Sequence, residues 1–189
     1  MPQIAYLKRK IRQLEKLVYK DELTKVYNRR GFLELTKKFL KELFSSIQDD
    51  KRKKVIIKNC SLILFDIDDF KKINDTFGHD AGDKALKILV NEIKTRIRDL
   101  DIIGRWGGEE IIVFLIGADK EHAFHIADYI RKKIENKKIK QKNQYINLTV
   151  SAGVSDFSRE KDFEKVFKLA DEALYKAKQT GKNKVVMAK

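Results

Sequence analysis

Apolar and polar residues follow one another with helical spacing over much of the chain. Apolar positions recur three or four residues apart in residues 86–97, 123–134 and 163–177, and a further apolar series runs through residues 33–43. Each pattern predicts an amphipathic helix with one face toward a core. A short helix is expected at residues 71–77, and residues 78–83 are expected to form a turn that opens the long helix after them. Gly181 follows the last helix as a C-terminal cap would.

The first twenty residues carry the spacing of a coiled coil. Ile4, Leu7, Ile11, Leu14 and Val18 are three, four, three and four residues apart, with charged and amide side chains between them. A helix this short is marginally stable alone. We therefore expect residues 1–20 to be an N-terminal signalling helix that pairs with a second copy or continues a longer helix. The alternative is an amphipathic helix that lies on its own domain, formed by residues 21–189.

Strand patterns alternate with these helices. Residues 61–65 predict a strand buried on both faces, residues 145–154 a half-buried strand, and residues 184–187 a closing strand. Two apolar runs flank Gly107 and Gly108, which predicts a tight hairpin turn in which both glycines take positive φ. Because this central pair is antiparallel, a mixed or antiparallel α/β sheet is favoured over a doubly wound parallel one.

Composition adds charge to this picture. The chain has 189 residues, with 42 Lys and Arg against 28 Asp and Glu, so a net charge of +14 favours an anionic ligand. Many lysines lie beside glutamates in helical segments, as on an ordinary solvated face. The single Cys60 excludes an internal disulfide and fits a reducing compartment. With no signal peptide and no apolar run near the length of a membrane span, we expect a soluble, cytoplasmic chain.

Acidic residues stand at the ends of two predicted strands. Asp66 follows a buried apolar run, where an unpaired carboxylate would be unfavourable, so a cation or a ligand N–H group must satisfy it. Glu109 and Glu110 lie at the rim of the glycine turn, and acids beside bare backbone N–H groups suggest a metal next to a phosphate. The alternative is a solvated turn with surface acids. Asp83, by itself, is typical of an acid at a helix N-terminus.

These features occur together in an order that resembles one family. The chain resembles the GGDEF family, the diguanylate cyclases, over roughly residues 21 to 187. The matching motifs are Asp21-x-Leu-Thr with Asn28-Arg-Arg, Asp66-Ile-Asp-x-Phe-Lys71, Asn74-Asp-x-Phe-Gly-His79, Gly82-Asp83, Arg105-x-Gly-Gly-Glu-Glu110, and Ala170-Asp-x-Ala-Leu-Tyr-x-Ala-Lys178 with Gly181-Lys-Asn183. The resemblance implies an α/β (α+β) fold with a central, mainly antiparallel five-stranded sheet flanked by helices, similar to nucleotide cyclases and polymerase palms.

The resemblance also implies an activity and a metal. Such domains condense two GTP into cyclic di-GMP and two pyrophosphates, a phosphoryl transfer that divalent metals assist. Mg²⁺ or Mn²⁺ would be held by Asp66, the carbonyl of Ile67 and Glu109, while Glu110 would assist the metals or the attacking hydroxyl. Asp68 is expected to have a structural role. Ile111 stands where the family signature has Phe, which puts the catalytic rate in doubt.

The GTP-binding residues are carried over in the same way. A carboxylate at Asp83, with the Asn74 amide as its partner, would recognise the guanine edge. The remaining expected contacts are the backbone N–H groups of Asp69 and Phe70, together with Lys71, His79, Lys178 and Lys182. Family members commonly carry Arg at position 182; Lys keeps the charge without the bidentate fork.

Regulation and partners follow from the same resemblance. Arg98 and Asp101 form an R-x-x-D motif nine residues before Gly107, which implies feedback inhibition by cyclic di-GMP. Each copy would bind one GTP, so catalysis implies a homodimer, with an upstream sensor domain acting through the N-terminal helix. The main alternative is a weak or inactive domain that binds GTP or cyclic di-GMP as a regulatory module. No aromatic-basic RNA signature or recognition-helix motif supports a nucleic-acid partner, and none of the three histidines has zinc-site spacing.

Overall fold

The computed structural model describes residues 3–4, 6, 10, 18–49, 59–141 and 144–189 of the chain. The helices are α2 (Arg29–Asp49), α3 (Phe70–Phe77), α4 (His79–Arg96), α5 (Lys120–Glu135) and α6 (Phe163–Gln179). The strands are β1 (Tyr27–Asn28), β2 (Cys60–Ile67), β3 (Ile102–Arg105), β4 (Glu110–Ile116), β5 (Lys138–Gln141), β6 (Gln144–Asn147), β7 (Val150–Asp156) and β8 (Val185–Met187).

A six-stranded sheet in the order β1-β3-β4-β2-β7-β8 forms the centre of the fold. The pairs β3–β4, β4–β2 and β2–β7 are antiparallel, whereas the outer strands β1 and β8 pair in parallel with β3 and β7. All eight residues of β2 are buried, because helices cover both faces of the strand. The expected mainly antiparallel α/β fold is therefore confirmed. The sheet has one strand more than the five expected, because the two-residue β1 joins its edge.

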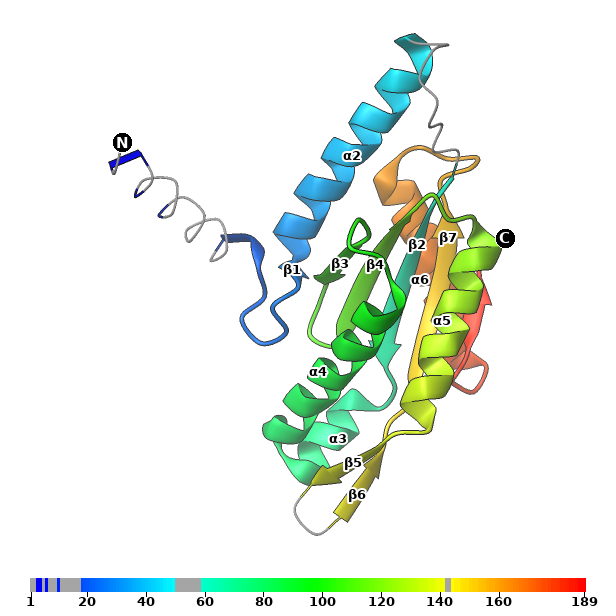
Figure 1. Ribbon diagram of the computed structural model, residues 1–189. Helices are drawn as coiled ribbons and strands as arrows, with labels where there is room; N and C mark the ends of the chain where they lie inside the picture. Colours follow the sequence, from blue (N-terminus) through cyan, green and yellow to red (C-terminus); the bar gives the residue numbers. More distant parts are fainter. Residues whose placement is uncertain (1–2, 5, 7–9, 11–17, 50–58, 142–143) are drawn as a thin grey trace.

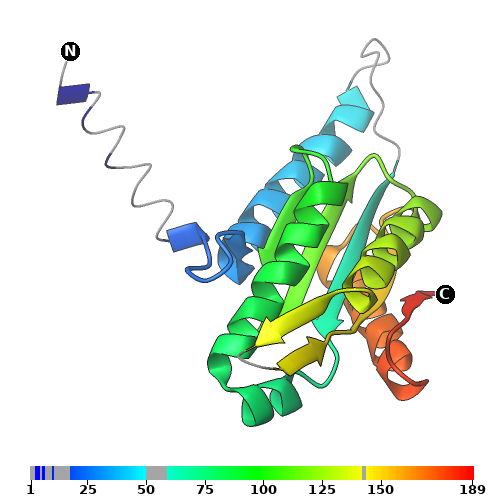
Figure 2. The same ribbon diagram turned by 60° about the horizontal axis from the view of Figure 1, so that its bottom comes forward.

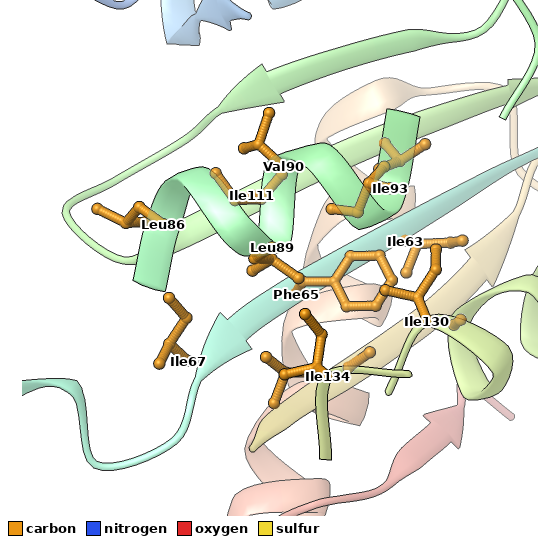
Figure 3. Close-up of a cluster of buried hydrophobic side chains, with 14 of the residues drawn as sticks. Ile63, Phe65, Ile67, Leu86, Leu89, Val90, Ile93, Ile111, Ile130 and Ile134 are labelled. Atoms are coloured by element: carbon orange, nitrogen blue, oxygen red, sulfur yellow. The ribbon is translucent and has the colours of Figure 1, made fainter. Parts of the chain in front are cut away.

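Helices cover both faces of this sheet. Alternate β2 residues such as Ile63 and Phe65 pack with α4 and α5, while Leu62 and Leu64 pack with α2 and α6. Figure 1 shows α4 and α5 in front of the sheet and α6 behind it. In Figure 3, Leu89 of α4 lies close to Phe65 in the middle of the first of these two layers.

Two predicted boundaries were wrong. Residues 145–154 form two strands, β6 and β7, in place of one, because β6 pairs only with β5 in a separate hairpin while β7 pairs with β2. The turn expected at residues 78–83 is also shorter: α4 begins at His79, directly after Gly78, whose φ of 86° separates α3 from α4. Figure 2 brings the β5–β6 hairpin forward, next to α4, and Lys84 Nζ donates to the Lys140 carbonyl at 2.6 Å.

The N-terminal segment is described in part. Ile4 and Val18, the outer heptad positions, are 62% and 42% exposed, while Leu7, Ile11 and Leu14 lie outside the described residues. The coiled coil at residues 1–20 stays a prediction. Among the described residues, no helix has the length and apolar character needed to cross a membrane.

Candidate functional site

Asp66 lies at the buried end of the central strand. Its side chain is 5% exposed, and its Oδ2 atom forms an ion pair with Lys178 Nζ on α6 at 2.7 Å. Within the described part of the chain, the buried Oδ1 atom has no hydrogen-bond partner. A buried carboxylate oxygen without a partner is unfavourable. Asp66 is thus half satisfied by the protein, as expected for a residue that binds a ligand or a cation.

The β3–β4 hairpin brings the two glutamates to Asp66. Glu110 is the register partner of Asp66 across the β2–β4 pair, so the two side chains project from the same face of the sheet. The hairpin prediction is confirmed, but its turn type was wrong. The loop runs from residue 106 to 109, and positive φ among the described glycines occurs at positions 78, 117 and 181 only.

Gly107 is required for a reason other than its φ angle. A Cβ atom built there would stand 2.3 Å from the Glu110 Oε2 atom. The glycine therefore leaves space for the Glu110 carboxylate to fold back over the loop. At Gly108, by contrast, an added Cβ meets nothing within 4 Å.

The three carboxylates repel one another. Burial raises the pKa of Asp66, and the hydrogen bond from Lys178 offsets this only in part. Burial also raises the pKa of Glu109 and that of Glu110, and the negative charge of Asp66 raises both further. The negative charge of Asp171 on α6 also raises the pKa of Glu110, whereas the positive charges of Lys178 and Arg29 lower it. The site therefore has an excess of negative charge that a cation would relieve.

The carboxylates do not converge on one point as they stand. No group of three or more His, Cys, Asp or Glu side chains in the described ranges is arranged to hold a metal ion. The donor set nevertheless fits a hard cation, because Asp66 keeps an oxygen without a partner and both glutamates carry raised pKa values.

Two contacts that fix the hairpin were not foreseen from the sequence. Arg105 Nη1 pairs with Asp21 Oδ2 at 3.1 Å, and its other nitrogens donate to the carbonyls of Gly107 and Gly108. Burial alone would raise the pKa of Asp21, but hydrogen bonds from Thr24 and the charge of Arg105 lower it. The segment entering the domain is thus tied to the glycine loop.

Aromatic packing holds the other side of the loop. Trp106 is 9% exposed and packs on Phe167 of α6, with 4.5 Å between ring centroids. The Arg29 guanidinium lies 4.5 Å from the centroid of the Trp106 ring. Sequence reasoning passed over Trp106 and Arg29 because their value depends on contacts among α2, α6 and the hairpin.

The turn between β2 and α3 supplies the predicted phosphate-binding residues. Asp69 has φ 55° at the N-terminus of α3, whose first N–H groups lack intrahelical acceptors. Lys182 reaches this turn and donates to Asp69 Oδ1 at 2.6 Å. The structure thus brings Asp69, Phe70 and Lys182 together, while Lys71 is exposed beside them.

Asp68 has the structural role predicted for it. It is 5% exposed and accepts hydrogen bonds from the hydroxyls of Thr149 and Ser151 and from the backbone N–H of Asn183. The partners come from two separate segments, the start of β7 and the α6–β8 loop, so Asp68 joins both of them to the end of β2.

A second polar position without a partner lies between α3 and α4. The buried Asn74 Oδ1 atom has no hydrogen-bond partner among the described residues. Gly82 makes room for it, because an added Cβ would stand 2.1 Å from that oxygen. Asp83 is the next residue and is partly exposed, while His79 is exposed at the start of α4. The α3–α4 pair thus holds an amide oxygen without a partner at Asn74 and a partly exposed carboxylate at Asp83.

Arg98 and Asp101 line a separate hollow of about 290 Å³ at the opposite end of β4 from Glu110. Asp101 Oδ2 accepts from the Arg98 N–H at 2.8 Å, and Oδ1 accepts from the Ile116 N–H at 2.9 Å. Arg96 and His122 also line the hollow. The two motif residues therefore share one site, in which Asp101 also shapes the loop.

Comparison with protein families gives a match over most of the chain. Residues 18–184 match the family described as "Diguanylate cyclase, GGDEF domain". Diguanylate cyclase A from Treponema denticola is 42% identical over 130 residues, which cover 68% of this chain and 35% of that protein. The chain spans about a third of the length of this relative.

Solved structures share the fold. The active GGEEF domain of a diguanylate cyclase from Vibrio cholerae matches with a TM-score of 0.73 and 33% identity, covering 86% of this chain and 97% of that one. The coiled coil and GGDEF domain of DgcB from Caulobacter crescentus, in complex with c-di-GMP, match with a TM-score of 0.87 and 23% identity. This second match covers 99% of this chain and 94% of that one and concerns the fold alone.

Proposed function

Because the chain belongs to the GGDEF family of diguanylate cyclases, we propose that it condenses two GTP into cyclic di-GMP and two pyrophosphates. The observation that carries this proposal is the pairing of Asp66 with Glu110 across β2 and β4, together with a buried Asp66 oxygen that has no partner in the described residues. This site has the donors and the excess negative charge that a metal-assisted phosphoryl transfer needs.

The carboxylates have two different roles in this reaction, metal binding and proton transfer. Asp66, Glu109 and the Ile67 carbonyl are the expected ligands of Mg²⁺ or Mn²⁺, which would stabilise charge on the attacking and leaving oxygens. Glu110, whose pKa is raised by burial and by Asp66, is suited to accept a proton from the attacking ribose 3′-hydroxyl. That hydroxyl attacks the α-phosphate of the other GTP, and pyrophosphate leaves.

Cations and backbone N–H groups would bind the triphosphate. Lys178 pairs with Asp66 and Lys182 with Asp69, so both ammonium groups border the start of α3. Negative phosphates are favoured at a helix N-terminus. Lys71 would add charge on the exposed side, and His79, exposed at the start of α4, would contact the nucleotide.

The base would bind on the α3–α4 pair. Guanine presents N1–H and N2–H₂ donors along one edge, which a carboxylate at Asp83 accepts, while the Asn74 oxygen takes one further donor. Adenine presents an acceptor at N1 and is disfavoured. The Asn74 oxygen, which has no partner within the described residues, is the observation that favours a ligand rich in donors here.

Synthesis requires two copies of the domain. Each site binds one GTP, and the two hydroxyl groups must each reach the opposite α-phosphate. We propose that the copies meet with their glycine loops facing, and that the N-terminal helix passes a signal from an upstream sensor to this arrangement. The Asp21–Arg105 pair, at 3.1 Å, is the contact through which the entering segment touches the loop.

Product analysis after incubation with GTP and Mg²⁺ tests this function. Cyclic di-GMP and pyrophosphate are expected, with a specific activity that falls on dilution because the active form is a dimer. If GTP binds but no cyclic dinucleotide forms at any protein concentration, the second candidate applies. That candidate is a regulatory module that binds GTP or cyclic di-GMP without turnover.

Product inhibition at Arg98 and Asp101 gives a further prediction. Arg98→Ala is expected to raise the cyclic di-GMP concentration for half-inhibition roughly tenfold or more, because a charge-assisted contact is lost. Initial rates at low product should equal those of the parent. Lys94→Ala is the control, since Lys94 is exposed near the end of α4, four residues before Arg98. An Arg98→Ala enzyme inhibited like the parent would exclude this site.

A further inference from the structure

The loop between α6 and β8 has an unusual backbone. Gly181, Lys182 and Asn183 follow one another with φ angles of 111°, 58° and 46°. The left-handed region suits Gly and is tolerated by Asn, but it is unfavourable for Lys. The surrounding structure must therefore hold Lys182 in this conformation.

Asn183 is the residue through which the loop is held. Its backbone N–H donates to Asp68 Oδ2 at 3.0 Å. Its side-chain oxygen accepts from Arg131 Nη1 at 2.9 Å, and its side-chain nitrogen donates to Glu135 Oε1 at 2.7 Å. Backbone and side chain are thus fixed from two sides, by the end of β2 and by α5.

Arg131 is a buried cation that the proposed reaction does not use. It is 9% exposed, and its guanidinium donates to Asp128 at 2.8 Å and to Glu135 at 2.9 Å besides Asn183. A planar guanidinium with several fixed donors can hold these acceptors in one geometry, which a single ammonium cannot.

Lys182 lies between this network and the β2–α3 turn. Its backbone N–H donates to the Ala177 carbonyl at 3.0 Å, closing the end of α6. Its Nζ atom lies 2.6 Å from Asp69 Oδ1, beside the N–H groups at the start of α3. The left-handed backbone at Lys182 and Asn183 turns the ammonium toward this position.

We propose that Asp68, Asn183 and Arg131 form a clamp that positions Lys182 for the GTP phosphates, so that Arg131 on α5 sets GTP affinity without contacting the nucleotide. This inference rests on the proposed function of the site. The clamp residues are positioning residues, and loss of any of them should weaken GTP binding through Lys182. Turnover at saturating GTP should change less, because Asp66, Glu109 and Glu110 stay in place.

A double-mutant cycle on the full chain tests the clamp. Equilibrium binding of an α,β-methylene GTP analogue with Mg²⁺, and KM and kcat for GTP, are measured for the parent, Arg131→Met, Lys182→Ala and the double variant. Each single variant is expected to bind roughly tenfold more weakly, the factor for one lost charge-assisted contact. The double variant should bind within about twofold of Lys182→Ala, since coupled residues are not additive.

Two further variants separate positioning from general stability. Asn183→Gly removes the side-chain contacts but keeps left-handed freedom, and it should match Arg131→Met in KM. Lys132→Met also replaces a cation of α5 with Met, one residue further along the helix. It removes an exposed ion pair to Asp128, and this variant should bind the analogue like the parent. Thermal unfolding confirms that each variant is folded at the assay temperature.

Each outcome decides between the explanations. Parent-like binding by Arg131→Met and Asn183→Gly would overturn the clamp while leaving the proposed function intact. Losses that multiply in the double variant would also overturn it, because a general loosening of the fold acts independently of Lys182. A parent chain that neither binds nor converts GTP would remove the proposed function and this inference with it.

Discussion

Replacing Glu110 with Gln is expected to lower cyclic di-GMP synthesis by about a thousandfold, within the range that a positioned acid or base contributes. Gln has nearly the same shape, so the space at Gly107 stays filled, but it neither accepts a proton nor carries charge. The measurement is product formation at saturating GTP over a range of protein concentrations. Glu172→Gln is the matched control, because Glu172 is an exposed α6 residue paired with Lys168 at 3.9 Å.

The same substitution should stabilise the folded protein at neutral pH in the absence of metal. The folded-state pKa of Glu110 is raised, so the folded protein binds protons more readily than the unfolded chain. The ionised group therefore destabilises the fold above its raised pKa, and this penalty disappears as the pH falls toward the value in the unfolded chain. Thermal unfolding in chelator should give a higher Tm for Glu110→Gln than for the parent near pH 7, with a difference that shrinks in acid.

A Tm for Glu110→Gln below that of the parent at pH 7 would contradict this account. It would mean that the attraction of the Glu110 carboxylate to Lys178 and Arg29 outweighs its burial and its repulsion from Asp66. Loss of activity without a gain in stability would then indicate a structural role. The two measurements together therefore distinguish a carboxylate kept for chemistry from one kept for folding.

Sequence patterns were sufficient for the parts of the fold that depend on local periodicity. The apolar run before Asp66 predicted a central buried strand, and β2 is buried over its whole length. The flanking helices followed from their stripes in the same way, because burial of one helical face sets the spacing of apolar residues. The preference for Asp68 as a structural residue also holds.

The remaining features depend on contacts between distant segments. Arg131 is an ordinary helical arginine in the sequence, yet it bonds to Asn183, which is 52 residues away. Asp21 and Arg105 are 84 residues apart. The type of the glycine loop escaped prediction for a similar reason: the close approach of the Glu110 carboxylate, and not a positive φ angle, requires Gly107.

Removing the Asp83 carboxylate is expected to remove the preference for guanine. Asp83→Ala should lower kcat/KM for GTP roughly a hundredfold to a thousandfold, because two hydrogen bonds from the base to a charged acceptor are lost. Use of ATP should stay the same or improve, since the carboxylate no longer opposes the adenine N1 acceptor. Competition assays with both nucleotides measure the ratio directly.

Asp80→Ala separates base recognition from helix stabilisation. Asp80 is the exposed acid in the first turn of α4, where a negative charge interacts with the helix dipole and contributes about 0.3–1 kcal/mol. If Asp83 only stabilised the helix, both variants would lose similar stability and keep the parent GTP-to-ATP ratio. A ratio that changes in Asp83→Ala alone assigns the carboxylate to the base, because a charge that acted only on the helix dipole would affect the use of GTP and ATP equally.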